Sequence, residues 1–518
     1  MKPQQVSSTF PAAGSPAPAS RCARVASLPA LTAVAVAIAS SLILTLGGCA
    51  SSAGISPTAQ PIDAAQVGVD PQGAAVPAVS TDWWRALGDS VLSELIERAL
   101  AGNPTLKIAQ TRMERAAASV AGARSAQGVQ VNGAADVTRQ RFSATSIYPP
   151  PLGGGIFDLA EATLGASWEI DFFGRNRAAV EAAVGVQRAA QADALAARNL
   201  LAVNVARTYV QLARWIEQRE VAQRSLNQRG EILGLIRQRV QGGLDTTVEL
   251  RQGEGALPET RQQIEQIDEQ IAMARNALAA YTAQAPQTLE STSAPLRTVH
   301  LLPKPANVPA DLLGRRADIV AARWRVEAAS QDVRSAHAQF YPNVNLTAFV
   351  GLSSIGLNRL SYAASKEWGV GPAIHLPIFD AGRLRANLSG KTADLDAAVL
   401  SYNAAVLDAV HDVADQLSSW RSIERQQTEQ DSAQTLAESA YDLATQRYRA
   451  GLGTYLAVLN AEANVLTQRR QATDLRARVL DVQIALIRAL GGGYGAETPP
   501  PDRAALAPRA GRPEAVGS

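Results

Sequence analysis

The pattern of apolar and polar residues changes abruptly near residue 174 of this chain. Between residues 162 and 172 apolar side chains occupy every second position, and Thr163, Glu169 and Asp171 are among the residues between them. This alternation is typical of a β-strand with lipid on one face and water on the other. After Arg175, apolar residues recur every three or four positions over about sixty residues without a proline. The second pattern predicts a helix roughly 90 to 100 Å long, which no small domain can accommodate.

Further segments repeat each pattern. Strands are predicted at 129–138, 344–353 and 367–378, and helices at 105–126, 248–284, 383–450 and 455–490. Pro258 is expected to kink or break its helix near the start. The helix at 383–450 has large apolar residues at coiled-coil spacing: Val399, Tyr402, Val406, Val410, Val413, Leu417 and Trp420.

The second half of the chain repeats the first. Gly174-Arg175 recurs as Gly382-Arg383, and Gly243-Leu244 recurs as Gly451-Leu452, both 208 residues further on. Two widely separated matches at one offset indicate an internal two-fold repeat. We therefore expect a first repeat at 81–285, with a β-hairpin at 127–173 and a helical hairpin at 175–284, a linker at 286–310, and a second repeat at 311–490, with a β-hairpin at 343–379 and a helical hairpin at 383–490.

Four strands of about ten residues are long enough to cross a bilayer when tilted, but they cannot close into a barrel. An open sheet in lipid leaves two edges of unpaired backbone groups, at several kcal/mol each. Association costs on the order of 4 to 15 kcal/mol per partner, so closure by several chains is favoured. Two chains would give a barrel filled by side chains, whereas three give twelve strands around water. The polar strand faces favour three, so the expected fold is mainly α with a membrane β-barrel: a trimeric twelve-stranded barrel continued by a long α-helical barrel.

The N-terminus resembles an export signal. An apolar run follows Arg21 and Arg24, and Leu46-Gly47-Gly48-Cys49 matches the bacterial lipoprotein signal, so residues 1–48 are expected to be removed. An uncleaved signal anchor is the alternative, because the run approaches membrane-spanning length. Cleavage would leave Cys49 as the single cysteine, lipidated and unable to form a disulfide within the chain. An extended tether is expected at 49–80 and a disordered tail at 491–518.

Composition excludes several classes of function. The chain of 518 residues has 49 Lys and Arg and 47 Asp and Glu, so its net charge of +2 gives no sign of a nucleic-acid-binding surface. Its four histidines lie apart, without metal-ligand spacing. His411-Asp412 superficially resembles a metal-dependent hydrolase dyad, but a solvated helix face is the favoured interpretation. Neither an enzyme nor a metal is expected, and no cofactor except a lipid on Cys49.

Several stretches together resemble the outer membrane factors of tripartite export pumps, the TolC-like family, and particularly its lipoprotein branch paired with RND-type efflux pumps. They are 83–106, Trp168-Glu-Ile-Asp-Phe-Phe-Gly-Arg175, Leu312-Leu-Gly-Arg-Arg-Ala-Asp318, Pro377-Ile-Phe-Asp-Ala-Gly-Arg383 and 447–460. The resemblance covers roughly residues 80–490. It implies a homotrimer in the outer membrane that extends into the periplasm, with an equatorial belt of short helices. It also implies a periplasmic tip that docks an adaptor (membrane fusion protein) connected to an inner-membrane RND pump.

The resemblance assigns roles to the two turns between long helices, because the family's tip is a closable iris. The expected adaptor-docking residues are Gly243, Leu244, Thr246, Gly451, Leu452, Gly453 and Thr454. The expected gate residues are Asp245, Glu249, Arg251, Leu456, Leu459 and Asn460.

Three-fold symmetry would make Asp245 and Glu249 into rings of carboxylates. Such rings repel and need water, a cation or a basic neighbour such as Arg239 or Arg251, whereas the simpler interpretation is a solvated helix end. Family members often have acids at the places of Ala457 and Asn460, and this departure favours a gate held by packing of Leu456 and Leu459.

The function that these features predict is passive exit of small molecules, such as drugs or other toxic compounds, through the outer membrane. The same duct could serve an ABC-type exporter or type I secretion. A different class of protein, a lipid-anchored trimeric coiled-coil scaffold or adhesin without conduction, is less suitable because it has no use for a lipid-facing Trp168 or Trp368. The sequence identifies neither the exported substrate nor the adaptor and pump.

Overall fold

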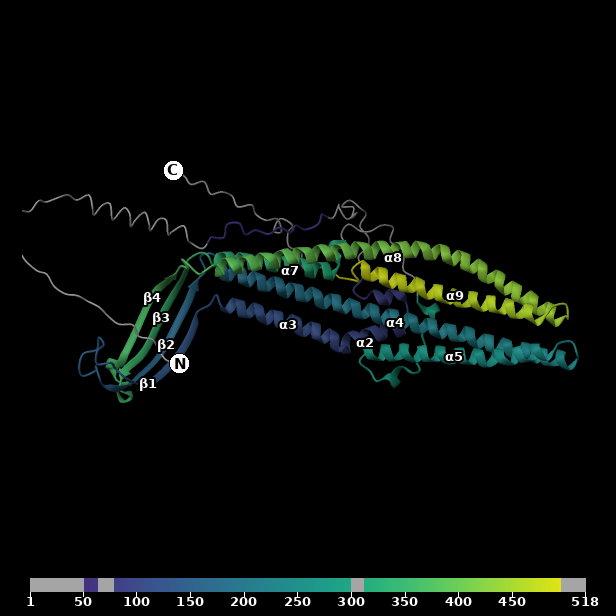
Figure 1. Ribbon diagram of the computed structural model, residues 1–518, viewed down its shortest axis with the longest axis horizontal. Helices are drawn as coiled ribbons and strands as arrows, with labels where there is room; N and C mark the ends of the chain where they lie inside the picture. Colours follow the sequence, from purple (N-terminus) through teal and green to yellow (C-terminus); the bar gives the residue numbers. More distant parts are fainter. Residues whose placement is uncertain (1–50, 64–78, 300–311, 495–518) are drawn as a thin grey trace, which may run out of the picture.

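The computed structural model describes residues 51–63, 79–299 and 312–494. The molecule is elongated (Figure 1). A four-stranded sheet lies at one end, two connections between helices lie at the other, and long helices join the two ends. The predicted signal peptide, Cys49 and most of the predicted tail lie outside the described residues. None of the described helices is both long and apolar enough to cross a membrane.

Both halves of the chain contain the same main elements in the same order. The first half has η3 (Trp83–Leu87), α2 (Ser90–Gly102), α3 (Pro104–Ser125), β1 (Gln130–Arg141), β2 (Ile156–Ile170), α4 (Arg175–Gln241) and α5 (Thr247–Tyr281). The second has α6 (Leu312–Arg315), α7 (Ala317–Ala338), β3 (Asn343–Ile355), β4 (Lys366–His375), α8 (Arg383–Arg449) and α9 (Tyr455–Ala489). Helices α3 and α7 each have 22 residues, α4 and α8 each have 67, and α5 and α9 each have 35. The internal repeat is therefore confirmed.

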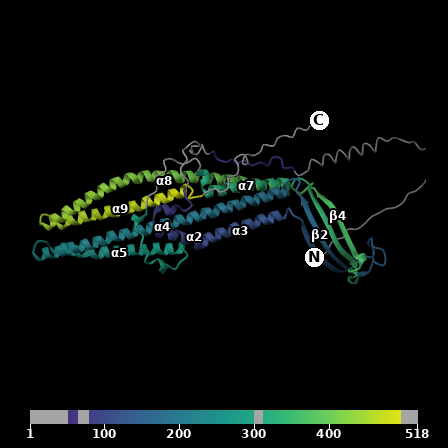
Figure 2. The same cartoon turned by 180° about the vertical axis from the view of Figure 1, so that it is seen from behind.

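Each long helix has two shorter helices of its own repeat packed along it. Helices α3 and α5 follow one another along α4, and α7 and α9 follow one another along α8, in both views of the molecule (Figure 1 and Figure 2). The predicted apolar stripe of α8 is directed towards the neighbouring helices. Five of its residues are buried: Val399, Val406, Val413, Leu417 and Trp420. Because most helical stability in proteins comes from tertiary packing, these contacts stabilise helices of this length.

The sheet is antiparallel, in the order β1-β2-β3-β4, and its register gives it two distinct faces. Val131 pairs with Ala166, Leu164 with Val350, and Val350 with Trp368, so one face is apolar across all four strands. The other face has the polar residues Asn132, Asp136, Glu161, Thr163, Ser167, Glu169, Asn345, Thr347 and Glu367. The predicted division of the sheet into an apolar and a polar face is confirmed.

Each β-hairpin passes into its long helix through a glycine in the left-handed region. Gly174 has φ +75° and Gly382 has φ +88°. Just before them, Asp171 accepts a hydrogen bond from the backbone N–H of Arg177 at 2.8 Å, and Asp380 caps α8 in the same way at 2.9 Å. Because the first N–H groups of a helix have no partner within it, these carboxylates satisfy them and fix the direction in which each helix leaves the sheet.

Several strand ends differ from the prediction, among them the start of β2 and the end of β4. Strand β2 begins at Ile156, six residues earlier than expected, although the alternation fails there. Phe157 lies on the same face as Glu161 and Thr163, and its ring centroid is 6.1 Å from that of Phe142, so aromatic packing by the outer loop extends the strand. Strand β4 ends at His375 rather than 378, because Pro377 has no N–H to donate to the sheet.

Helix α5 does not break at Pro258. It is continuous from Thr247 to Tyr281, with the proline inside it. Pro258 is exposed, so water can satisfy the carbonyl that loses its helical partner. Continuous packing along α4 holds the helix together across this position.

Two segments that were predicted to be simple connectors are packed against the helices. In residues 51–63, the N–H groups of Thr58 and Ala59 donate to Asp396 of α8 at 2.9 and 3.0 Å. The described part of the predicted linker forms two short turns, η4 (Pro286–Leu289) and η5 (Leu296–Thr298). Leu289 and Leu296 are buried in the core cluster that includes α2 and α4. Both segments therefore cover the helical rod near its middle or its sheet end.

Candidate functional site

At the end of the molecule opposite the sheet, α4 and α8 end in the same way. The chain passes from α4 to α5 through Gly243 and from α8 to α9 through Gly451, with φ of +72° and +73°. The N–H groups of Leu244 and Leu452 then donate to carbonyls five residues earlier, both at 2.8 Å. This Schellman arrangement favours glycine because other residues are strained at positive φ. The geometry of the turn therefore accounts for both glycines.

Threonines begin the next helices, and here the two turns differ. Thr246 and Thr454 are both N-caps whose side chains accept a backbone hydrogen bond. In the first turn, Glu249 completes a capping box by accepting the N–H of Thr246 at 2.9 Å. Ala457 holds the equivalent position in the second turn, which therefore has no such box. Hydrogen bonds from Thr246 lower the pKa of Glu249, which is exposed at the helix end.

Asp245 joins the two turns to each other. Its carboxylate accepts two hydrogen bonds from Arg239 at 2.9 and 3.1 Å and one from the hydroxyl of Tyr448. The side chain of Asp245 is only 10% exposed. Arg239 also donates to the backbone carbonyl of Tyr448 at 3.2 Å, and its guanidinium lies 4.6 Å from the ring centroid. The α4–α5 hairpin is thereby linked to α8 at the tip.

The contacts between Arg239, Asp245 and Tyr448 shift the pKa values of Asp245 and Tyr448. The hydrogen bond from Arg239 is the main cause that lowers the pKa of Asp245, and the hydroxyl of Tyr448 adds to it. Burial of the Tyr448 hydroxyl is the main cause that raises its pKa, and the hydrogen bond to the negatively charged Asp245 raises it further. At neutral pH the link therefore consists of a carboxylate, a guanidinium and a protonated phenol. Sequence reasoning named Arg239 as a neighbour but missed Tyr448, although its motif at 447–460 was part of the resemblance.

The other predicted tip residues do not join this link. Arg251 pairs with Glu254 at 2.9 Å, and its side chain is 80% exposed. Leu456 and Asn460 are exposed, whereas Leu459 is half-buried against the core of the helical hairpins. Leu244 and Leu452 are about equally exposed, at 69% and 72%. The tip therefore presents two matching apolar side chains to its surroundings, one from each repeat.

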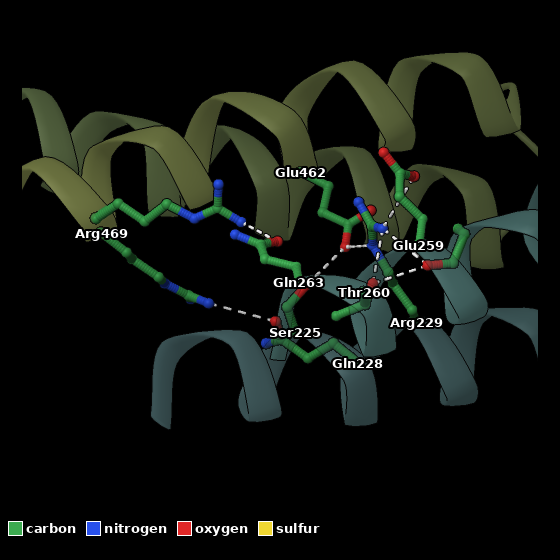
Figure 3. A network of polar contacts seen from close by, with 10 residues as sticks. Ser225, Gln228, Arg229, Glu259, Thr260, Gln263, Glu462 and Arg469 are labelled. Atoms are coloured by element: carbon green, nitrogen blue, oxygen red, sulfur yellow. Dashed lines mark hydrogen bonds and ion pairs between the residues drawn. The ribbon is translucent and has the colours of Figure 1, made fainter. Parts of the chain in front are cut away.

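A second polar cluster, which the sequence did not indicate, joins the same elements further from the tip (Figure 3). Arg229 of α4 donates to Glu462 of α9 at 2.8 Å and to Thr260 of α5 at 2.9 Å. The side chains of Arg229 and Glu462 are 16% and 8% exposed, so this is a buried ion pair. Arg469 of α9 reaches Gln228 of α4 at 3.3 Å. The two helical hairpins are thus joined at the tip and again along their length.

The residues with a superficial resemblance to an enzyme site have structural contacts. Asp412 accepts hydrogen bonds from Arg316 and Arg488, both at 3.2 Å, and His411 is exposed beside it. Arg316 is buried and also binds Asp318 at 2.7 Å, which explains the arginine and acid in the motif at 312–318. Among the described residues, no group of three or more His, Cys, Asp and Glu side chains could hold a metal ion.

Comparisons with known proteins match this architecture. The sequence model of the family described as outer membrane efflux protein matches residues 95–284 and 308–492, once for each repeat. The fusaric acid resistance protein FusA of Burkholderia cepacia is 36% identical over 68% of this chain and 68% of that protein. The putative multidrug resistance outer membrane protein MdtQ of Escherichia coli K12 is 32% identical over 88% of this chain and 97% of that protein. The crystal structure of the outer membrane protein VceC from Vibrio cholerae has a TM-score of 0.76 at 36% identity, covering 80% of this chain and all of that one.

These matches extend over the sheet and both helical hairpins, and they confirm the predicted architecture and efflux function. The family consists of outer-membrane channels that form trimers and work with adaptor proteins and inner-membrane pumps. The scaffold or adhesin alternative is therefore rejected. This chain belongs to the outer membrane efflux protein family and is a TolC-like efflux channel.

Proposed function

We propose that three copies of this chain form the passive exit duct of a tripartite efflux system, driven by an RND-type pump through a periplasmic adaptor. The cargo proposed is small toxic molecules such as drugs. The observation that carries this proposal is the similarity to MdtQ, a protein named for multidrug resistance, over 97% of that protein's length. The relation to FusA, named for fusaric acid resistance, agrees with a small organic cargo. No energy source is required within the chain, because the pump supplies it.

The tip is the proposed gate and adaptor-docking surface. The exposed Leu244 and Leu452 offer apolar contacts next to the two glycine turns, which have closely similar backbone geometry, and this suits a partner that binds both repeats alike. The Asp245 link is the proposed latch of the closed state, because it holds the two helical hairpins together at the end that must widen. Leu456, Leu459 and Asn460 lie at the start of α9, just after the second turn, and are proposed to narrow the aperture in the trimer.

The proposed lipid anchor is Cys49, in the periplasmic leaflet of the outer membrane. The hydroxyl oxygen of Ser52 lies 3.1 Å from Nε2 of His337, near the end of α7 that leads into β3. Ser52 is three residues from Cys49 in the sequence, and three residues span at most about 10 Å. This distance fits a lipid in the leaflet that meets the helical part of the molecule.

Two measurements test the duct. The purified protein is expected to have the mass of a trimer in detergent and to conduct ions in planar bilayers; a monomer without conductance would overturn the proposal. In cells that lack their own outer membrane factors, the gene is expected to restore drug resistance together with its cognate RND pump and adaptor. Restoration only with an ABC-type exporter would assign the duct to that system instead.

A further inference from the structure

The charged residues of the sheet are separated by sign between its two faces. Alternation and register place Asp136, Glu161, Glu169 and Glu367 on the polar face. The same register places Arg139, Arg141 and Lys366 on the apolar face, with Asp158 as the only carboxylate there within the four strands. Cations on a face that meets lipid need an explanation, because such residues are costly in hydrocarbon.

The three cations lie at the end of the sheet that is distant from the helices. Strand β1 ends at Arg141 and β4 begins at Lys366, and both ends are next to the outer loops. From Gln130 to Arg141 a strand extends about 37 Å, or roughly 26 Å of depth at a 45° tilt. This distance matches the apolar band of a barrel, so the cations lie at the outer boundary of the hydrocarbon. Charges at that depth cost only about 0 to 1 kcal/mol.

Closure of the barrel brings the cations together. Strands β1 and β4 are the two edges of the sheet in one chain. In a closed trimer, the order of strands requires β4 of one protomer to pair with β1 of the next. Lys366 then lies at the same end and on the same face as Arg139 and Arg141 of the partner subunit. Each of the three seams between protomers would carry this cluster.

The cluster is poorly neutralised within the chain. Arg139 and Asp158 are 3.8 Å apart, and their side chains are 76% and 45% exposed, so the pair is a weak surface contact. Arg141 and Lys366 are also exposed. Three cations against one carboxylate leave each seam with an excess of positive charge towards the outer leaflet.

We propose that each seam binds a phosphorylated lipid headgroup of the outer leaflet, held by Lys366 of one protomer and by Arg139 and Arg141 of the partner subunit. Guanidinium groups match phosphate oxygens in bidentate geometry, and such charge-assisted hydrogen bonds are stronger at a low-dielectric boundary. A lipid bound in this way fastens two protomers to each other at the membrane surface. The proposal goes beyond the duct function and rests only on closure of the barrel by three copies.

The test measures binding of bisphosphorylated lipid A to the detergent-purified trimer by native mass spectrometry. The probe is compared with the same glycolipid lacking its phosphates and with inorganic phosphate. Wild-type trimers are expected to prefer the phosphorylated lipid. The triple variant Arg139→Gln, Arg141→Gln, Lys366→Gln should bind it on the order of tenfold more weakly, and Asp158→Asn should bind it more tightly. Strong binding of inorganic phosphate alone would indicate a simple anion site and would overturn the lipid proposal.

The matched control is Arg237→Gln, near the opposite end of the molecule. Arg237 is 57% exposed and lies 3.8 Å from Glu254, much like Arg139 beside Asp158, and its loss should leave lipid binding unchanged. A triple variant that remains trimeric and binds lipid A like the wild type would overturn the proposal, as would equal binding of the dephosphorylated lipid. If the triple variant does not form trimers, Asp158→Asn decides: tighter binding supports the site and unchanged binding rejects it. A monomeric wild type would instead be a failure of the proposed duct.

Discussion

Asp245 and Glu249 lie four residues apart at the same end of the molecule, but they have different structural roles because their surroundings differ. Asp245 is nearly buried and joins the two hairpins through Arg239 and Tyr448. Glu249 is exposed and closes the capping box of α5. Both carboxylates could be named from the sequence as candidates near the axis. The sequence could not show the difference, because Asp245 and Tyr448 are 203 residues apart and meet only when the two repeats pack together.

Loss of the Asp245 carboxylate should loosen the tip. Charge-assisted hydrogen bonds contribute about 1.5 to 3 kcal/mol each, so Asp245→Asn is expected to raise the open probability in planar bilayers on the order of tenfold at neutral pH. Tyr448→Phe removes one of the hydrogen bonds and should have a smaller effect in the same direction. An unchanged closed state in both variants would show that Asp245 is not a latch.

The pH dependence of the wild type follows from the same contacts. The folded-state pKa of Asp245 is below its usual value of 3.8, so the link contributes stability above that value and loses it as the pH falls through the lower, folded-state pKa. Open probability should therefore stay constant from pH 7 to about pH 4 and rise only below that. Asp245→Asn should lose this acid-induced rise.

Glu249 allows charge and helix capping to be separated. Glutamine also completes a capping box, so Glu249→Gln removes the charge and keeps the cap, whereas Glu249→Ala removes both. If the cap is its only role, Glu249→Gln should conduct like the wild type, and only Glu249→Ala should reduce the stability of the tip, by about 0.5 to 2 kcal/mol. Altered conductance or altered block by divalent cations in Glu249→Gln would instead show a carboxylate ring at the aperture.

The buried ion pair along the hairpins has an internal control, since Arg229 contacts two glutamates. Glu462 is 8% exposed and Glu259, which lies 3.7 Å from the same guanidinium, is 75% exposed. Glu462→Ala would leave the buried arginine without its carboxylate at a cost of about 3 to 5 kcal/mol, whereas Glu259→Ala should cost less than about 1 kcal/mol. Thermal unfolding followed by circular dichroism measures the difference, and equal destabilisation by the two variants would contradict the assignment.

At the scale of elements, the sequence predicts most where the signal is local and repeated. Two-residue alternation is enough to assign the faces of all four strands, and the glycine–arginine junctions locate the start of both long helices. The sequence predicts less at element ends, where distant contacts decide. Strand β2 continues to Ile156 because the outer loop packs on Phe157, and α5 continues through Pro258 because α4 supports it. The packing of residues 51–63 on α8 depends on Asp396 and Asn403, about 340 residues away, and no local pattern reveals it.

The assignment of faces predicts opposite outcomes for one substitution at two positions of β3. Val350 lies in the middle of the apolar face and Thr347 on the polar face, and both are exposed in a single chain. Val350→Lys should destabilise the membrane-inserted trimer by about 2 to 4 kcal/mol and reduce its yield in outer membranes. Thr347→Lys should assemble normally and lower cation conductance. Normal yield of Val350→Lys would mean that the faces are reversed or that β3 does not contact lipid.

At the scale of the whole molecule, three copies turn the polar face into the wall of a pore. Each chain contributes Asp136, Glu161, Glu169 and Glu367 to that face, and within the four strands no Lys or Arg lies there. A water-filled barrel lined by carboxylates raises the local concentration of cations and lowers that of anions. The charge of the wall therefore depends on the same alternation that allows the sheet to enter lipid.

This arrangement predicts that the open duct selects for cations. Reversal potentials measured across a salt gradient should show cation preference in a variant with an open tip, such as Asp245→Asn. Adding Glu161→Gln and Glu367→Gln should shift the reversal potential towards zero, because the carboxylates that concentrate cations are removed in all three copies. Asp158→Asn on the outer face is the matched control and should leave the reversal potential unchanged. Equal shifts from the inner and outer substitutions would show that these strands do not enclose the conducting path.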